Sequence, residues 1–132
     1  MSLLDLSGAQ TVFWAASKAL AERCQPGYQL HTASLEGGLV NTVEGLAVDT
    51  RALRELDIAA LHTLVVPGAP DICQTLDEHA ELTAWLRRNA PVARRVVSVC
   101  SGAFLLAQSG LLDGCRTATC WQTMLPIECP TK

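Results

Sequence analysis

The spacing of apolar residues in the second half of the chain predicts strands that alternate with helices. Residues 61–66 form an apolar run that ends at Pro67, as a buried central strand would. Residues 94–99 form a second such run, and residues 101–112 follow it with the spacing of a helix. Between the two runs, a helical stripe that ends before Pro91 consists of Leu76, Ala80, Leu82, Trp85 and Leu86.

Shorter patterns occur toward the two ends of the chain. Residues 8–23 place apolar side chains on one face of a helix, with Ser7 as the candidate N-cap. Residues 28–34 alternate between polar and apolar positions like a half-buried strand, and residues 116–121 predict one more short strand. Glycines and prolines separate these segments.

The order of these elements indicates an α/β fold. Strands that alternate with helices predict a parallel sheet with helices on both faces. The 132 residues suit one small domain, and the sequence shows no internal repeat and no linker, so we expect a single domain over residues 1–132. Sheets of this kind place their chemistry at the carboxyl ends of the strands, which directs attention to the residues after Val66 and Val99.

Composition and charge narrow the classes of function. Hydrophobic residues make up 49% and charged residues 17% of the chain, which is typical of a packed globular protein. The formal net charge is −3 and the arginines occur in short pairs, so we expect no direct nucleic-acid binding by this chain. The N-terminus has neither a basic flank nor a long apolar segment, so we expect no secretion signal, no membrane partner and a cytoplasmic location.

The six cysteines are expected to be thiols, because disulfide frameworks belong to secreted proteins. No CxxC spacing occurs, and no histidine lies beside the cysteines near the C-terminus, so we expect no metal site and no cofactor. One of the six, Cys100, directly follows a predicted buried strand.

Cys100 stands in the segment SVCSGAF, between a predicted strand and a predicted helix. A nucleophile in such a sharp turn needs small residues two positions before and after it, and Ser98 and Gly102 satisfy this. The turn would expose the thiol, and the start of the helix would stabilise its thiolate. The alternative is a buried packing residue, since free cysteine is among the most buried residue types, and the spacing alone leaves both interpretations open.

If Cys100 is a nucleophile, the backbone amides around it gain a role. The N–H of Ser101 and that of Gly68 or Ala69, at the end of the neighbouring strand, would form an oxyanion hole. A carboxyl group within hydrogen-bond reach of the thiol could carry its proton.

Four segments, in this order, resemble the ThiJ/PfpI superfamily. They are LLDLSGAQTVF, LVVPGAP, LTAWLRR and SVCSGAFLLAQSGLLDGCRTATCW, and they extend from Leu3 to Trp121. The sequence is most similar to the N-terminal domains of AraC-type transcriptional regulators of the GlxA kind, and it also resembles the isocyanide hydratases. The resemblance implies a flavodoxin-like three-layer sandwich with a mostly parallel sheet, like that of class I glutamine amidotransferase domains.

The resemblance also implies roles for particular residues. Cys100 aligns with the family's cysteine in the strand-to-helix turn, and Asp5 aligns with the acidic residue that contacts this cysteine in the hydratases. Gly68 aligns with the first glycine of the family's PGG motif, in which Ala69 replaces the second. Cys100 and Asp5 are therefore the catalytic candidates, and Gly68, Ala69 and Ser101 are the oxyanion or ligand-binding candidates. The competing interpretation makes Asp5 a residue at the entry to the first helix.

The chain departs from the family pattern in three places. Cys120 stands where the family has a histidine, and we expect His31, His62 and His79 to be surface residues that do not replace it. The family has a buried central strand before LLDLSG, and it continues beyond Trp121 with further strands and a helix. We therefore interpret the sequence as an incomplete family domain, without the first central strand and the C-terminal elements, or as a gene fragment without function.

Three hypotheses for function follow. The first is a ligand-sensing or dimerisation domain like that of AraC-type regulators, without the DNA-binding helix-turn-helix, which binds a small molecule near Cys100 and forms a homodimer in the full-length protein. The second is a cysteine-dependent hydratase of the isocyanide hydratase type, with Cys100 as nucleophile and Asp5 as general acid/base. The third is a redox-sensitive thiol at Cys100. We favour the first, because SVCSGAFLLAQSGLLDG is closer in detail to the regulators.

Overall fold

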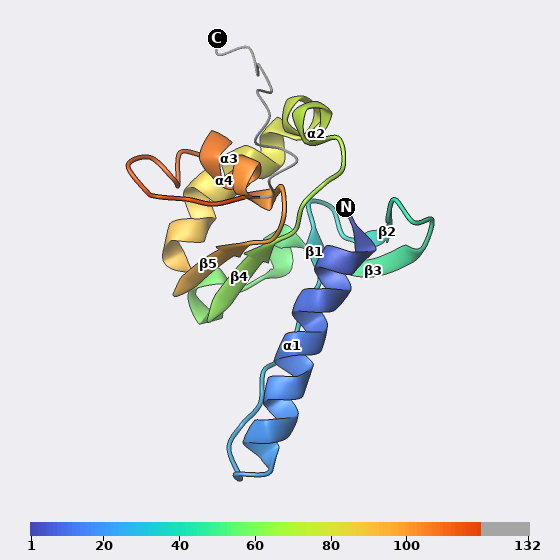
Figure 1. The fold of residues 1–132 in the computed structure, drawn as a ribbon, viewed down its shortest axis with the longest axis vertical. Helices are drawn as coiled ribbons and strands as arrows, with labels where there is room; N and C mark the ends of the chain where they lie inside the picture. The colour runs from blue at the N-terminus through green and yellow to red at the C-terminus, as the bar shows by residue number, and fades with distance from the viewer. Residues whose placement is uncertain (120–132) are drawn as a thin grey trace. The chain divides into compact units, whose positions relative to one another are not determined.

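The computed structural model describes residues 1–119 of the chain (Figure 1). Their contacts group into two compact units, one formed by Met1–Leu56 and the other beginning at Asp57. Each unit has its own sheet. No helix in residues 1–119 is long and apolar enough to cross a lipid bilayer.

The first unit consists of one long helix and a three-stranded sheet. Helix α1 covers Leu3–Ala21. The strands, in their order across the sheet, are β1 (Ala33–Ser34), β3 (Ala47–Ala52) and β2 (Gly38–Asn41). β2 and β3 form an antiparallel hairpin, whereas β1 runs parallel to β3. A short 3-10 helix, Leu53–Glu55, ends the unit.

Helix α1 begins at Leu3, earlier than the sequence predicts. The loop between β2 and β3 supplies its cap, because the Glu44 carboxylate accepts hydrogen bonds from the Leu3 N–H at 2.9 Å and from the Ser2 hydroxyl at 3.2 Å. Ser7, the predicted N-cap, lies inside the helix instead. A cap that comes from a distant loop leaves no signal in the local sequence around the helix start.

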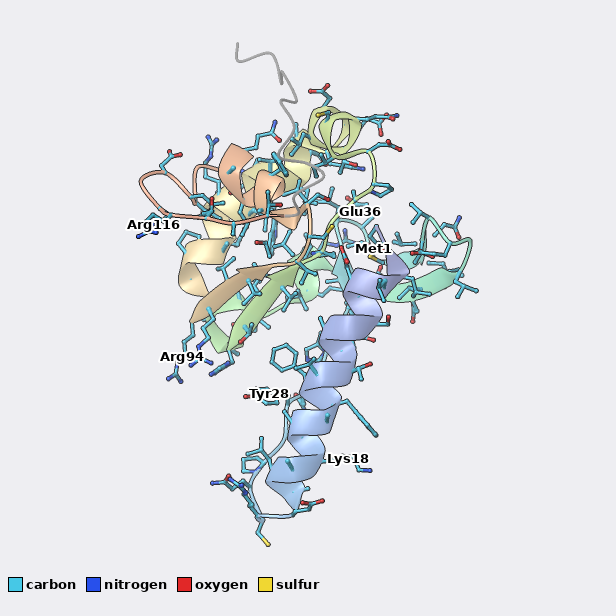
Figure 2. The ribbon with its side chains drawn as sticks, in the orientation of Figure 1. Met1, Lys18, Tyr28, Glu36, Arg94 and Arg116 are labelled. Carbon is cyan, nitrogen blue, oxygen red and sulfur yellow. The ribbon has the colours of Figure 1, made fainter. Side chains whose placement is uncertain are left out.

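The predicted strand over residues 28–34 is wrong for most of its length, because only Ala33–Ser34 belongs to a strand. The residues before β1 contact helix α1 instead (Figure 2). The Tyr28 N–H donates to Ser17 Oγ at 2.8 Å, and the Tyr28 ring meets the Phe13 ring edge to face with centroids 5.0 Å apart. Alternating polarity marks a half-buried extended segment, and here a helix provides the apolar surface that a sheet was expected to provide.

The second unit is built on two parallel strands. β4 (Thr63–Val66) pairs with β5 (Arg95–Ser98) in a register that sets Val66 opposite Ser98. The helices are α2 (Ile72–Glu78) and α3 (Ala80–Asn89) between the strands and α4 (Gly102–Gln108) after β5, with 3-10 turns at Ile58–Ala60 and Ala90–Val92.

Apolar side chains of these elements form the core of the second unit. All three helices lie on the same side of the β4–β5 pair (Figure 1). Their buried residues meet the end of β4 in a cluster made of Val66, Ile72, Leu76, Leu86, Ala90, Leu105 and Leu106. Because α4 contributes Leu105 and Leu106 to this cluster, the core fixes the helix that follows Cys100.

The observed elements confirm the predicted α/β class and correct two of the predicted strands, residues 28–34 and residues 116–121. β4 and β5 lie inside the predicted apolar runs and are parallel, as expected. Within residues 1–119, β4 pairs with no strand other than β5, so the sheet of this unit is incomplete. Arg116–Thr119 is not a strand, and the rest of that predicted strand, with Cys120, lies outside the described residues.

Candidate functional site

Cys100 lies in the turn that connects β5 to α4. Its backbone φ is 53°, in the left-handed region that residues other than glycine rarely adopt, and its side chain is exposed. A strained backbone of this kind costs about 1–3 kcal/mol, so the surrounding contacts must hold it in place. The interpretation of Cys100 as a buried packing residue is therefore wrong.

Gly102, the first residue of α4, explains how the turn can be so sharp. A Cβ atom at this position would collide with the carbonyl oxygen of Val66 and would lie 2.9 Å from that of Pro67. The Gly102 N–H donates to the Val99 carbonyl at 3.0 Å, and the Val99 N–H donates to the Val66 carbonyl at 3.0 Å. The backbone of α4 thus touches the end of β4, which requires a residue without a side chain two positions after Cys100.

Two side-chain hydroxyl groups form hydrogen bonds that connect the turn to neighbouring segments. Ser101 is buried, and its Oγ accepts the Ala69 N–H at 3.0 Å and donates to the Ala69 carbonyl at 2.8 Å. Thr119 Oγ1 donates to the Cys100 carbonyl at 2.9 Å. These bonds supply the restraint that a left-handed Cys100 requires, and they connect it to the loop after β4 and to the segment 116–119.

The structure brings four of the five predicted site residues together at the carboxyl ends of β4 and β5. Gly68 and Ala69 follow β4, while Cys100 and Ser101 follow β5. The Ala69 N–H is already engaged, because it donates to Ser101 Oγ. An oxyanion hole that includes the backbone N–H of Ser101 and of Gly68 stays a prediction.

Asp5, the fifth predicted site residue, lies in the first turn of helix α1 in the first unit. Its pairing with Cys100 of the second unit stays a prediction. His62 stands directly before β4, so it lies at the end of the strand opposite to the Cys100 turn, with its Nδ1 2.9 Å from Thr63 Oγ1. His62 therefore does not replace the histidine that the family pattern places at position 120.

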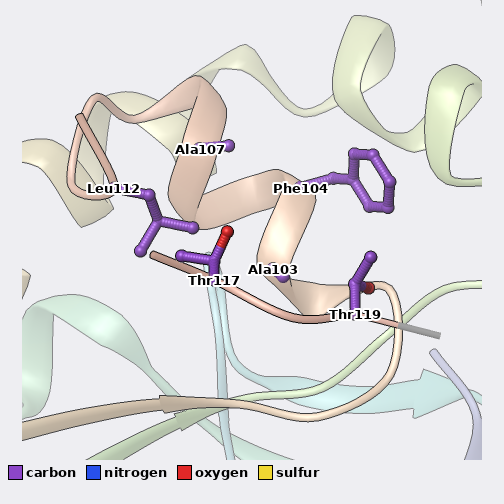
Figure 3. A pocket seen from close by; sticks show the side chains of 6 residues that line it. All are labelled: Ala103, Phe104, Ala107, Leu112, Thr117 and Thr119. Atoms are coloured by element: carbon purple, nitrogen blue, oxygen red, sulfur yellow. The ribbon is translucent and has the colours of Figure 1, made fainter. Parts of the chain in front are cut away.

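A cavity of about 190 Å³ opens beside the Cys100 turn (Figure 3). One face of α4 and the segment after it line the cavity, through Ala103, Phe104, Ala107, Leu112, Thr117 and Thr119. Thr119 joins the cavity to the turn, because its hydroxyl bonds the Cys100 carbonyl. The sequence gives no sign of this cavity, because residues 116–121 have the pattern of a strand and no local pattern shows that the segment runs along α4.

The parallel strands, the helices that connect them and the cysteine after β5 define an α/β domain of the flavodoxin-like class. The model of the DJ-1/PfpI family matches residues 10–128, which is most of the chain. The chain therefore belongs to the DJ-1/PfpI family, as its ThiJ/PfpI resemblance predicts.

The relatives of the chain include a regulator and an enzyme. It is 39% identical to the "Uncharacterized protein in cpoL 5'region" of Streptomyces lividans, over 99% of this chain and 89% of that protein. It is 34% identical to the HTH-type transcriptional regulator GlxA of Rhizobium meliloti, over 81% of this chain and 32% of the regulator. It is 31% identical to the isonitrile hydratase of Pseudomonas putida, over 73% of this chain and 41% of the enzyme. The chain thus spans less than half the length of the regulator and of the hydratase.

A solved structure supports the fold. The crystal structure of a ThiJ/PfpI family protein from Pseudomonas syringae matches with a TM-score of 0.61 at 23% sequence identity. The match covers 84% of this chain and 42% of that one, in agreement with an α/β fold whose sheet is incomplete.

Proposed function

We propose that this chain is a ligand-sensing or dimerisation domain of the kind found in transcriptional regulators, and that Cys100 is its reactive group. The observation that carries the proposal is the exposed, left-handed Cys100 at the end of β5. The similarity to GlxA supports a regulatory role. The proposed partners are a small molecule and a second copy of the chain, and direct contact with nucleic acid is not part of the role.

The backbone conformation around Cys100 supports a functional role for its thiol. Residues in strained conformations persist only where the surrounding structure determines them, and they cluster at functional sites. Here Ser101, Gly102 and Thr119 all act on the same turn. These three residues together hold the backbone of a turn whose thiol is exposed to solvent.

The proposal predicts that Cys100 is the fastest-reacting of the described thiols. Cys24 is the matched control, because it is also exposed and has a φ of 55°, but it follows the end of α1 rather than preceding a helix. Treatment with limiting iodoacetamide near neutral pH, followed by peptide mapping, measures each rate. Cys100 should react about tenfold faster than Cys24 and Cys115. Equal rates at Cys100 and Cys24 would refute a functional thiol.

An enzymatic role is the second candidate, and the 31% sequence identity to an isonitrile hydratase favours it. In this scheme the Cys100 thiolate adds to the terminal carbon of an isonitrile, and Asp5 delivers the proton that the adduct requires. Water then attacks the resulting thioimidate, the carbon–sulfur bond breaks, and an N-substituted formamide leaves with the thiol restored. The net reaction adds one water to the isonitrile, so no oxidant or reductant is needed.

Product analysis separates the two candidates. The protein is incubated with excess cyclohexyl isocyanide, and the formamide is followed by NMR, with Cys100→Ser and Asp5→Asn as variants. An enzyme forms many equivalents of formamide per chain, and both substitutions lower the rate. A sensing domain forms none above the buffer control. Turnover that depends on Cys100 would therefore replace the first proposal with the second.

A further inference from the structure

The cavity beside α4 offers a binding site next to the Cys100 turn. We propose that it binds a small, neutral, largely apolar molecule that carries one hydrogen-bonding group, and that Thr119 transmits its occupancy to Cys100. The inference rests on the proposed function, because it locates the ligand of the proposed sensing domain. It places that ligand against α4 rather than on the thiol.

The size and the walls of the cavity define the apolar part of the ligand. Its volume is about 190 Å³, and apolar cavities of about 150 Å³ accept a benzene molecule. Phe104 and Leu112 supply large apolar surfaces, while Ala103 and Ala107 leave the face of α4 open. None of the six lining residues is charged, so the lining offers a charged ligand no ionic partner.

The hydroxyl of Thr117 defines the polar part. It points into the cavity toward Ala107 (Figure 3). A hydroxyl both donates and accepts hydrogen bonds, so it fits an alcohol, a phenol or a carbonyl group of a ligand. A few placed polar groups in an otherwise apolar pocket are the usual means of orienting a small ligand.

Thr119 connects this cavity to the reactive residue. Its side chain lines the cavity, and its Oγ1 donates to the Cys100 carbonyl at 2.9 Å. A ligand that packs against Thr119 restrains this bond and therefore the left-handed conformation of Cys100. Occupancy of the cavity should then be measurable as a change in the reactivity of the thiol.

The binding test uses 4-fluorophenol as the probe and the whole chain. Titration is followed by ¹⁹F NMR. Ala107→Phe places a ring in the cavity and should weaken binding about tenfold, whereas Gln108→Phe adds the same ring one residue outside the lining and should change affinity less than about twofold. Absence of saturable binding to the wild-type chain, or equal loss in both variants, would overturn the inference.

A second variant keeps the test informative if Ala107→Phe does not fold. Thr117→Val preserves the shape of the side chain and removes the hydroxyl. The substitution should weaken the binding of 4-fluorophenol about fivefold and leave the binding of fluorobenzene unchanged, because only the phenol can form a hydrogen bond with the Thr117 hydroxyl. An equal effect on both probes would contradict the polar assignment.

The coupling test measures alkylation of Cys100 by iodoacetamide with and without saturating 4-fluorophenol. The probe should slow alkylation at least about threefold in the wild-type chain and have no effect in Thr119→Val, which lacks the hydroxyl. An unchanged rate in the presence of bound probe would refute the coupling. Without probe, alkylation of Cys100 that is faster than that of Cys24, in a chain that shows no saturable binding of 4-fluorophenol, would reject this inference alone. Without probe, alkylation of Cys100 no faster than that of Cys24 would reject the proposed function, even in a chain that binds 4-fluorophenol.

Discussion

Gly102 and Ser101 decide, at the scale of single residues, whether Cys100 can keep its conformation. Gly102 lets the α4 backbone touch the Val66 carbonyl, and the Ser101 hydroxyl satisfies both the N–H and the carbonyl of Ala69. A buried backbone group that loses its partner costs about 1–3 kcal/mol. Both residues are therefore constrained by their backbone contacts, independently of any chemistry that Cys100 performs.

The Gly102→Ala substitution should destabilise the protein by about 2–4 kcal/mol, because the new Cβ meets fixed carbonyl oxygens rather than a flexible side chain. Gly8→Ala is the matched control. Gly8 lies inside helix α1, and a Cβ atom there would meet nothing within 4 Å, so alanine should stabilise the protein by about 0.5–1 kcal/mol. Urea denaturation followed by circular dichroism measures both. A Gly102→Ala protein as stable as the wild type would show that α4 can move away from β4.

At the scale of elements, helix α1 depends on a side chain from another element. The Leu3 N–H donates to the Glu44 carboxylate and is the main reason that the pKa of Glu44 is lowered from its ordinary value of 4.5. A carboxyl whose pKa is lower in the folded protein stabilises it at pH values above 4.5, and this stabilisation is lost as the pH falls through the lowered pKa.

The Glu44→Gln substitution removes the charge that caps α1 and should therefore lower the Tm of the protein at neutral pH. The difference in Tm from the wild type should shrink as the pH falls below 4.5. Helicity at 222 nm, recorded against temperature at several pH values, measures this. Glu36→Gln is the control, because the Glu36–Arg54 ion pair is exposed at both ends and such pairs contribute little. A difference in Tm between wild type and Glu44→Gln that persists at acidic pH would contradict capping of α1 by the Glu44 carboxylate.

At the scale of the whole molecule, the two units differ in how much apolar surface holds them. No residue of α1, over Leu3–Ala21, is buried, whereas Leu86 of α3 and Leu105 of α4 are 2% and 4% exposed. Elements with few buried side chains open locally at low free-energy cost. Hydrogen exchange followed by mass spectrometry should show peptides of α1 exchanging before those of α3 and α4. Equal protection in the two units would mean that α1 is held by contacts beyond those of the described chain.

The fold and the site differ in how far local patterns could predict them. The apolar runs of β4 and β5 and the stripe from Leu76 to Leu86 follow from the sequence, because burial on a strand or a helix leaves a period in it. The structure divides this stripe between two helices, since α2 ends at Glu78 and α3 begins at Ala80. The segment 28–34 was predicted as a strand because alternation does not say which element lies beside it. The Cys100 turn was predicted from small neighbours, while Thr119 was missed because its role depends on where its segment returns.

The sequence by itself determined the α/β class, the positions of the two parallel strands and a sharp turn at Cys100, since each follows from residues close together in the chain. The tertiary structure decided that Cys100 is exposed, that Ser101 binds Ala69, that Glu44 caps α1 and that a cavity lies against α4. The contacts of Ser101 and of Glu44 join segments far apart in the sequence, while the exposure of Cys100 and the cavity depend on where the neighbouring segments run. Local periodicity carries no information about which distant segments meet, so only the folded chain could supply it.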